Sequence, residues 1–76
     1  MTLRELPHRQ AARIVKVRLD LAETQWLRAL GIVEGVAVQV LRAGLFGGPL
    51  QVRVGEHAAF AIDRTVAASI DVEPGP

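Results

Sequence analysis

Few residues in this chain have side chains that could catalyse a reaction or bind a metal. The sequence contains two histidines, one serine, and no cysteine or tyrosine. A mononuclear metal site needs several converging ligands, and His8 and His57 have only scattered carboxylates to join them. Glu56 precedes His57, but neighbouring residues of a strand point to opposite faces. We therefore expect two surface histidines and no metal site.

Nucleophilic catalysis has equally little support. Ser69 lacks a Gly-x-Ser-x-Gly context, and the absence of cysteine removes thiolates and disulfides together. A domain this small buries only about 60% of the surface of its unfolded chain, which leaves little volume for an enclosed active site. We predict a protein that is not an enzyme and needs no cofactor.

The stretch GLFGGP, residues 44–49, is rich in glycine and could suggest a phosphate cradle. It joins two predicted strands, however, and lacks the Lys-Ser/Thr of a P-loop. It is instead typical of a wide hairpin turn shaped by Gly47 and Pro49. The apolar pair Leu45-Phe46 within it has two interpretations. Either Phe46 packs back on the domain and Leu45 covers it, or the pair stays exposed as part of a docking surface.

The periodicity of apolar residues predicts the elements that position these side chains. Alternation and β-branched residues predict strands over residues 11–18, 36–42, 50–54, 57–62 and 69–73. Helical spacing predicts a helix over residues 21–30, with Asp20 as its N-cap and Gly31 as its stop. We expect Gly35 to turn the chain into the next strand, and residues 63–68 to form a short helical turn.

Five short strands and one inserted helix are best accommodated by a small, mainly β, SH3-like barrel. We expect one domain over residues 1–76, with residues 74–76 as a disordered tail. Trp26, within the predicted helix, would either pack on the barrel or mark a contact surface. Three aromatic residues are too few for a groove that binds proline-rich peptides.

Charge and hydropathy argue against nucleic acids as partners and against insertion into a membrane. The formal net charge is +1, and basic residues form no continuous stripe, so we expect no nucleic-acid binding. The first ten residues have no apolar run typical of a signal peptide, and no segment is apolar enough to span a membrane. We predict a cytoplasmic protein with at most indirect membrane association.

Three segments in the right order resemble the FeoA family. The family has a Leu-x-x-Leu/Met-Gly-Leu/Ile-x-x-Gly turn, which is matched here by Leu27, Leu30, Gly31, Ile32 and Gly35. Its hairpin loop is matched by Phe46, Gly47 and Pro49. Its closing Leu-x-x-x-x-Ala-x-x-Ile-x-Val pattern is matched by Ile62 in place of the leucine, and by Ala67, Ile70 and Val72. The chain departs from the family at Leu45, usually proline, and Gly48, usually aspartate.

The resemblance implies a small, non-enzymatic accessory protein of bacterial ferrous iron uptake, which acts by contact with the FeoB transporter or its G-protein domain. The alternative is a free-standing regulatory module, because the same domain occurs at the C-terminus of iron-dependent repressors. This chain has no helix-turn-helix segment, so it would not read DNA itself.

The apolar residues around the helix end and the hairpin loop form the predicted docking surface: Leu27, Leu30, Ile32, Leu45 and Phe46. A thin core together with an exposed apolar tip would also permit weak homo-oligomers.

Overall fold

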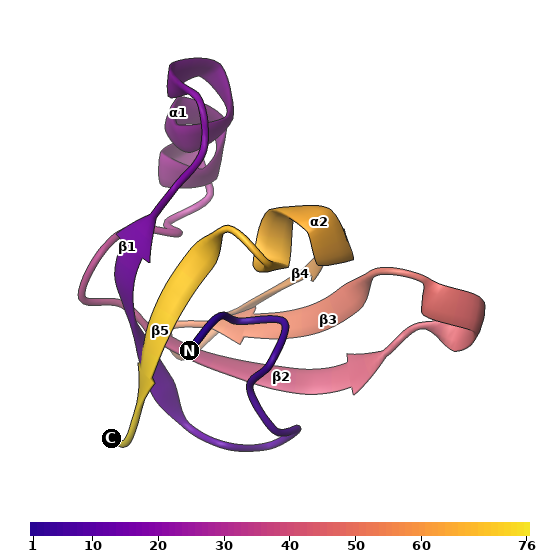
Figure 1. Cartoon of the computed structure of the whole chain (residues 1–76). Helices are drawn as coiled ribbons and strands as arrows, with labels where there is room; N and C mark the ends of the chain where they lie inside the picture. The colour runs from indigo at the N-terminus through magenta and orange to yellow at the C-terminus, as the bar shows by residue number, and fades with distance from the viewer.

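A computed structural model describes all residues of the chain, 1–76, and is mainly β (Figure 1). Its elements in order are β1 (Ala12–Val17), α1 (Leu21–Ala29), β2 (Ala37–Ala43), the 3-10 turn η1 (Leu45–Gly47), β3 (Leu50–Val54), β4 (Ala58–Ile62), α2 (Arg64–Ala67) and β5 (Ile70–Pro74). The strands form one antiparallel sheet in the order β4-β3-β2-β1-β5. The predicted five strands, inserted helix and short helical turn are confirmed, with ends that differ by at most one residue.

The core is a single cluster of 15 buried residues, all of them hydrophobic. Alternate residues of β2 and β3 supply its centre, including Val38, Val40 and Val52. The sheet is therefore stabilised mainly by aliphatic side chains, as the apolar alternation of these strands predicted.

Strand β1 departs from simple alternation. Strict alternation would place Ile14 and Lys16 on one face, but Ile14 is buried, Lys16 is exposed and Val17 is half-buried. The cause is a register shift between Ile14 and Lys16 in the pairing with β5. Such a bulge reverses the facing of the residues beyond it, so Lys16 reaches solvent and Val17 reaches the core.

The N-terminal segment covers the edge of β5, which sequence reasoning did not anticipate. The Leu3 amide donates to the Ile70 carbonyl at 2.8 Å, and the Val72 amide donates to the Met1 carbonyl at 2.8 Å. Leu3 and Leu6 are buried in the core. The segment therefore completes both the hydrogen bonding of β5 and the hydrophobic core.

The other end of the chain is more ordered than predicted. Pro74 belongs to β5, and the Gly75 amide donates to the Ala11 carbonyl at 2.9 Å. The expectation of a disordered tail from residue 74 is wrong for these two residues, because the β1–β5 ladder continues to the pair Ala12–Pro74.

Helix α1 begins where the sequence predicted. The Asp20 carboxylate accepts a hydrogen bond of 2.8 Å from the Glu23 amide, as an N-cap should. Gly31, just beyond the helix, has φ of +87°. Leu27 is the one buried residue of α1, so the helix stands out from the sheet (Figure 1). Neither helix has the length and apolar content needed to cross a membrane.

Candidate functional site

The most exposed large apolar side chains lie at the tip of the β2–β3 hairpin. Leu45 is 84% exposed and Phe46 is fully exposed. These two residues, hereafter the hairpin tip, project from the domain at the end of the hairpin that is distant from α1 (Figure 1). Of the two interpretations of the pair, the structure excludes the one in which Phe46 packs back on the barrel.

Main-chain and side-chain contacts hold the loop around the hairpin tip. The Gly44 amide donates to the Pro49 carbonyl at 2.9 Å, and the Gly48 amide donates to the Leu45 carbonyl at 3.0 Å. Nε of Arg64, at the start of α2, donates to the Gly48 carbonyl at 2.9 Å. A Cβ atom at position 44 would lie 2.9 Å from the Pro49 oxygen, so the close approach of the two ends of the loop requires glycine at this position. The loop is therefore a closed, packed turn.

The backbone of Phe46 is left-handed, with φ of +54° and ψ of +42°. This region is uncommon for residues other than glycine, asparagine and aspartate. It costs roughly 1–2 kcal/mol for an L-residue with a Cβ atom. Phe46 thus combines an unfavourable backbone conformation with a side chain that gains nothing from burial.

The structure separates the other residues of the predicted docking surface from the hairpin tip. Leu27 is 1% exposed and Ile32 is 2% exposed, so both belong to the core and border solvent only at the pockets beside α1. Leu30 is half-buried. Helical periodicity could not show this, because the fold buries only Leu27 of α1 and not a broad apolar stripe.

Trp26 is 60% exposed, so of the two interpretations of this residue the one in which it packs on the barrel is wrong. It borders an apolar pocket of about 250 Å³ between α1, β4 and α2. Leu30, Phe60 and Val66 also line this pocket. Sequence reasoning missed it, because its walls come from three separate segments.

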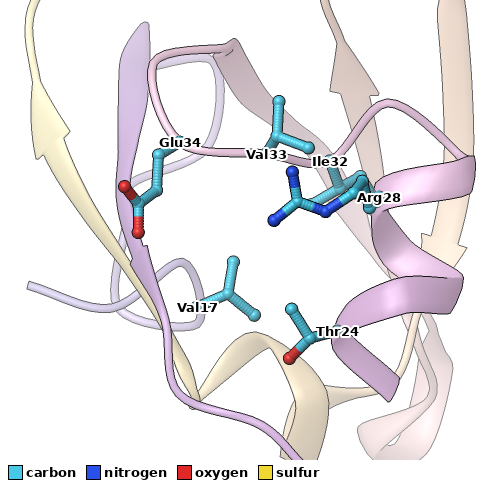
Figure 2. Close-up of a pocket in the computed structure, with 6 residues that line it drawn as sticks. All are labelled: Val17, Thr24, Arg28, Ile32, Val33 and Glu34. Atoms are coloured by element: carbon cyan, nitrogen blue, oxygen red, sulfur yellow. The ribbon is translucent and has the colours of Figure 1, made fainter. Parts of the chain in front are cut away.

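A second pocket of about 280 Å³ lies between α1, the end of β1 and the loop before β2 (Figure 2). Arg28 extends into it from α1, and Glu34 borders it from the loop (Figure 2). Neither side chain forms an ion pair within the chain. Val17, Thr24, Ile32 and Val33 complete the lining, so three of its six residues are apolar. The pocket offers one positive charge and one negative charge, and the Thr24 hydroxyl in its lining donates to the Leu19 carbonyl.

The remaining titratable groups form one strong contact. The Arg18 guanidinium binds both carboxylate oxygens of Asp71, at 2.8 and 2.9 Å, and also donates to the Ala68 carbonyl. These hydrogen bonds lower the pKa of Asp71 below its ordinary value of 3.8. His57 lies 3.7 Å from Glu56, and no three histidine, aspartate or glutamate side chains gather as metal ligands.

Comparison of the sequence and of the fold with known proteins identifies the same family. The FeoA domain family matches residues 1–74. A FeoA protein of Stenotrophomonas maltophilia, solved with zinc and described as an SH3-domain protein, is 36% identical, with a TM-score of 0.74 over 96% of this chain and 89% of that one. The FeoA protein of Chlorobium tepidum is 31% identical, with a TM-score of 0.83 over 97% of this chain and 70% of that one.

The predicted kinship with repressor domains extends to the fold alone. The manganese regulator SloR has a TM-score of 0.83, but it is 15% identical, and this chain covers 34% of it. No match was found among curated proteins. The predicted SH3-like fold is confirmed by the Stenotrophomonas protein. With its family match over nearly the whole length and two solved relatives above 30% identity, this chain belongs to the FeoA family, whose members have an accessory role in ferrous iron transport.

Proposed function

We propose that the protein is a cytoplasmic, non-enzymatic accessory protein that binds the cytosolic part of a FeoB-type ferrous iron transporter through the hairpin tip. Family membership supports the transport context. The description of the Stenotrophomonas relative as possibly a ferrous iron transport activating factor is in keeping with a modulating role. The sequence departs from the family at Leu45, so the tip presents a leucine where proline is usual.

The observation that carries the proposal is the full exposure of Phe46 on a closed loop. Burying a side chain such as leucine or phenylalanine is worth about 1.5–3 kcal/mol, and the hairpin tip forgoes this twice. A strained backbone that displays an unburied side chain is more readily explained by a contact than by folding. Aromatic anchors that enter a partner's pocket commonly dominate the energetics of protein interfaces.

Leu30 is the one other residue of the predicted docking surface that retains exposed area. It lies in the pocket beside Trp26 and not at the hairpin tip. We propose it as a second, separate contact. A regulatory module of the repressor type is not proposed, because the likeness to SloR shows the fold alone.

The test is a calorimetric titration of the FeoB G-protein domain with the wild type, with Phe46→Ala and with Leu21→Ala, each with and without guanine nucleotide. Leu21 is a matched control, since it is a strongly exposed leucine on α1, away from the hairpin. We expect Phe46→Ala to weaken binding by at least about tenfold, or 1.4 kcal/mol. Leu21→Ala should bind like the wild type, and all three proteins should unfold at similar temperatures.

Two results would contradict the proposal. One is the absence of wild-type binding at about 500 µM under both nucleotide conditions, which leaves less than about 4–5 kcal/mol for any contact. The other is equal binding by the wild type and Phe46→Ala, which would assign the contact to another surface.

A further inference from the structure

Strand β4 is the one edge of the sheet that no other segment covers. The opposite edge, β5, bonds to the N-terminal segment through Met1 and Leu3. The main chain of β4, by contrast, bonds only to β3. Because successive residues of a strand direct their amide and carbonyl groups to alternate sides, half of those of β4 point outward without a partner.

The sequence of β4 lacks the features that usually protect an exposed edge. Natural edges carry lysine, proline, inward-pointing charges or bulges that prevent pairing with another chain. β4 reads Ala-Ala-Phe-Ala-Ile and contains no charged residue and no proline. Its ladder with β3 runs regularly from Leu50–Ile62 to Val54–Ala58, whereas the β1–β5 and β2–β3 ladders both contain register shifts.

We propose that β4 pairs antiparallel with β4 of a second copy, about a two-fold axis that passes between the two Phe60 residues. In this register Ala59 lies opposite Ala61 of the second copy, and Ala58 lies opposite Ile62. Two-fold symmetry is the commonest arrangement of homo-oligomers. It allows the free main-chain groups of β4 to bond to the same groups of the second copy. The result is a continuous sheet across two domains.

Charge complementarity selects both the partner and the register. The strand is preceded by Glu56 and His57 and followed by Asp63 and Arg64. In the proposed register His57 faces Asp63 of the second copy and Glu56 faces Arg64, and symmetry repeats both pairs. A shift by two residues in either direction would place Glu56 opposite Ile62, or Arg64 opposite Ala58, and would lose this match.

Of the four flanking side chains, only Arg64 is bonded to a distant segment of its own chain. The Asp63 carboxylate makes no capping hydrogen bond to α2. The side chains of His57 and Glu56 are about nine-tenths exposed and have only each other, at 3.7 Å. Nε of Arg64 is committed to Gly48, which leaves the terminal nitrogens of its guanidinium for Glu56 of the second copy.

The apolar surface next to the strand is consistent with the same axis. Phe60 and Ile62 of β4 line the pocket that Trp26 and Val66 also border. Pairing at β4 would bring two such pockets to the axis and place the two Phe60 rings across neighbouring strands, where aromatic pairs are favourable. The exposed Trp26 would then lie beside the interface.

The register can be tested by charge placement at two exposed residues of β4, Ala59 and Ala61. Ala59→Glu/Ala61→Glu puts like charges opposite one another across the axis, and Ala59→Glu/Ala61→Lys puts opposite charges there. Within one copy, position 59 pairs with Arg53 and position 61 with Gln51, so neither variant places like charges opposite each other in the β3–β4 ladder. Sedimentation velocity from micromolar to about 1 mM protein measures association, and thermal unfolding checks the fold.

We expect the wild type and the Glu/Lys variant to dimerise, and the Glu/Glu variant to associate at least about tenfold more weakly while it remains folded. A monomeric wild type at about 1 mM would overturn the proposal. So would a Glu/Glu variant that dimerises like the wild type, because the interface would then lie elsewhere. A monomeric Glu/Lys variant would refute the register. These measurements contain no transporter, so their failure is distinct from failure of the proposed function.

Discussion

Nε of Arg64 donates a 2.9 Å hydrogen bond to the carbonyl of Gly48, and this contact joins α2 to the loop that carries the hairpin tip. The two residues are 16 positions apart in the chain. A loop with three glycines would otherwise sample many conformations, since glycine has the largest backbone freedom. The bond therefore contributes to the fixed presentation of Leu45 and Phe46.

Arg64→Ala should loosen the loop without unfolding the domain. Its loss leaves the Gly48 carbonyl without this donor, so we expect faster hydrogen exchange at the Gly44 and Gly48 amides, measured by NMR. Arg42→Ala is the matched control, because Nε of Arg42 bonds at 2.9 Å to the Gln51 side chain in the strands that flank the loop, and not to the main chain of the loop. Equal exchange at these amides in both variants would show that Arg64 does not order the loop.

Phe46→Asn should separate stability from partner binding. Asparagine tolerates the left-handed backbone found at position 46, and the fully exposed phenylalanine loses no burial. We expect the free energy of unfolding in urea to stay unchanged or to rise by about 0.5–1 kcal/mol, with loss of binding to the FeoB G-protein domain. A loss of more than about 2 kcal/mol of stability would mean that Phe46 packs in solution after all.

Leu27→Ala should lower the free energy of unfolding more than Trp26→Ala does, although tryptophan is the larger side chain. Leu27 is 1% exposed, and its truncation should cost about 2–5 kcal/mol of unfolding free energy, much of the stability of so small a domain. Trp26 is 60% exposed, and its truncation should cost less than about 1.5 kcal/mol. Urea denaturation followed by circular dichroism measures both, and a reversed order would contradict the core assignment.

The contact between Arg18 and Asp71 should make stability depend on pH in acid. The pKa of Asp71 is lowered in the folded state, so its contribution is present above the ordinary value of 3.8 and disappears as the pH falls through the lower folded value. Asp71→Asn should therefore be less stable than the wild type at neutral pH, with a difference that shrinks below pH 3.8.

The control for this pH dependence is Glu73→Gln, a neighbour in β5 that forms no ion pair. It should follow the wild-type curve of unfolding free energy against pH. A constant difference between Asp71→Asn and the wild type from pH 2 to 7 would show that the carboxylate is not stabilised by its partner in the fold.

The local elements of this protein were determined by the sequence itself. β3 was predicted at the bounds that the structure shows, because its apolar and polar residues alternate strictly, which is the two-residue period of a strand. The start of α1 was equally predictable, because Asp20 and Glu23 have the spacing of a cap and its amide. These features depend on neighbours within a few residues.

What only the tertiary structure decided is which apolar residues face solvent. Leu27 and Trp26 are adjacent on one helix, yet one is buried and the other exposed, because Leu27 is the only residue of α1 that the rest of the fold buries. The covering of β5 by Leu3, the free edge of β4 and the exposure of Phe46 likewise follow from segments distant in sequence. Local periodicity shows on which face of an element an apolar residue lies, but its burial depends on which other segment packs against that face.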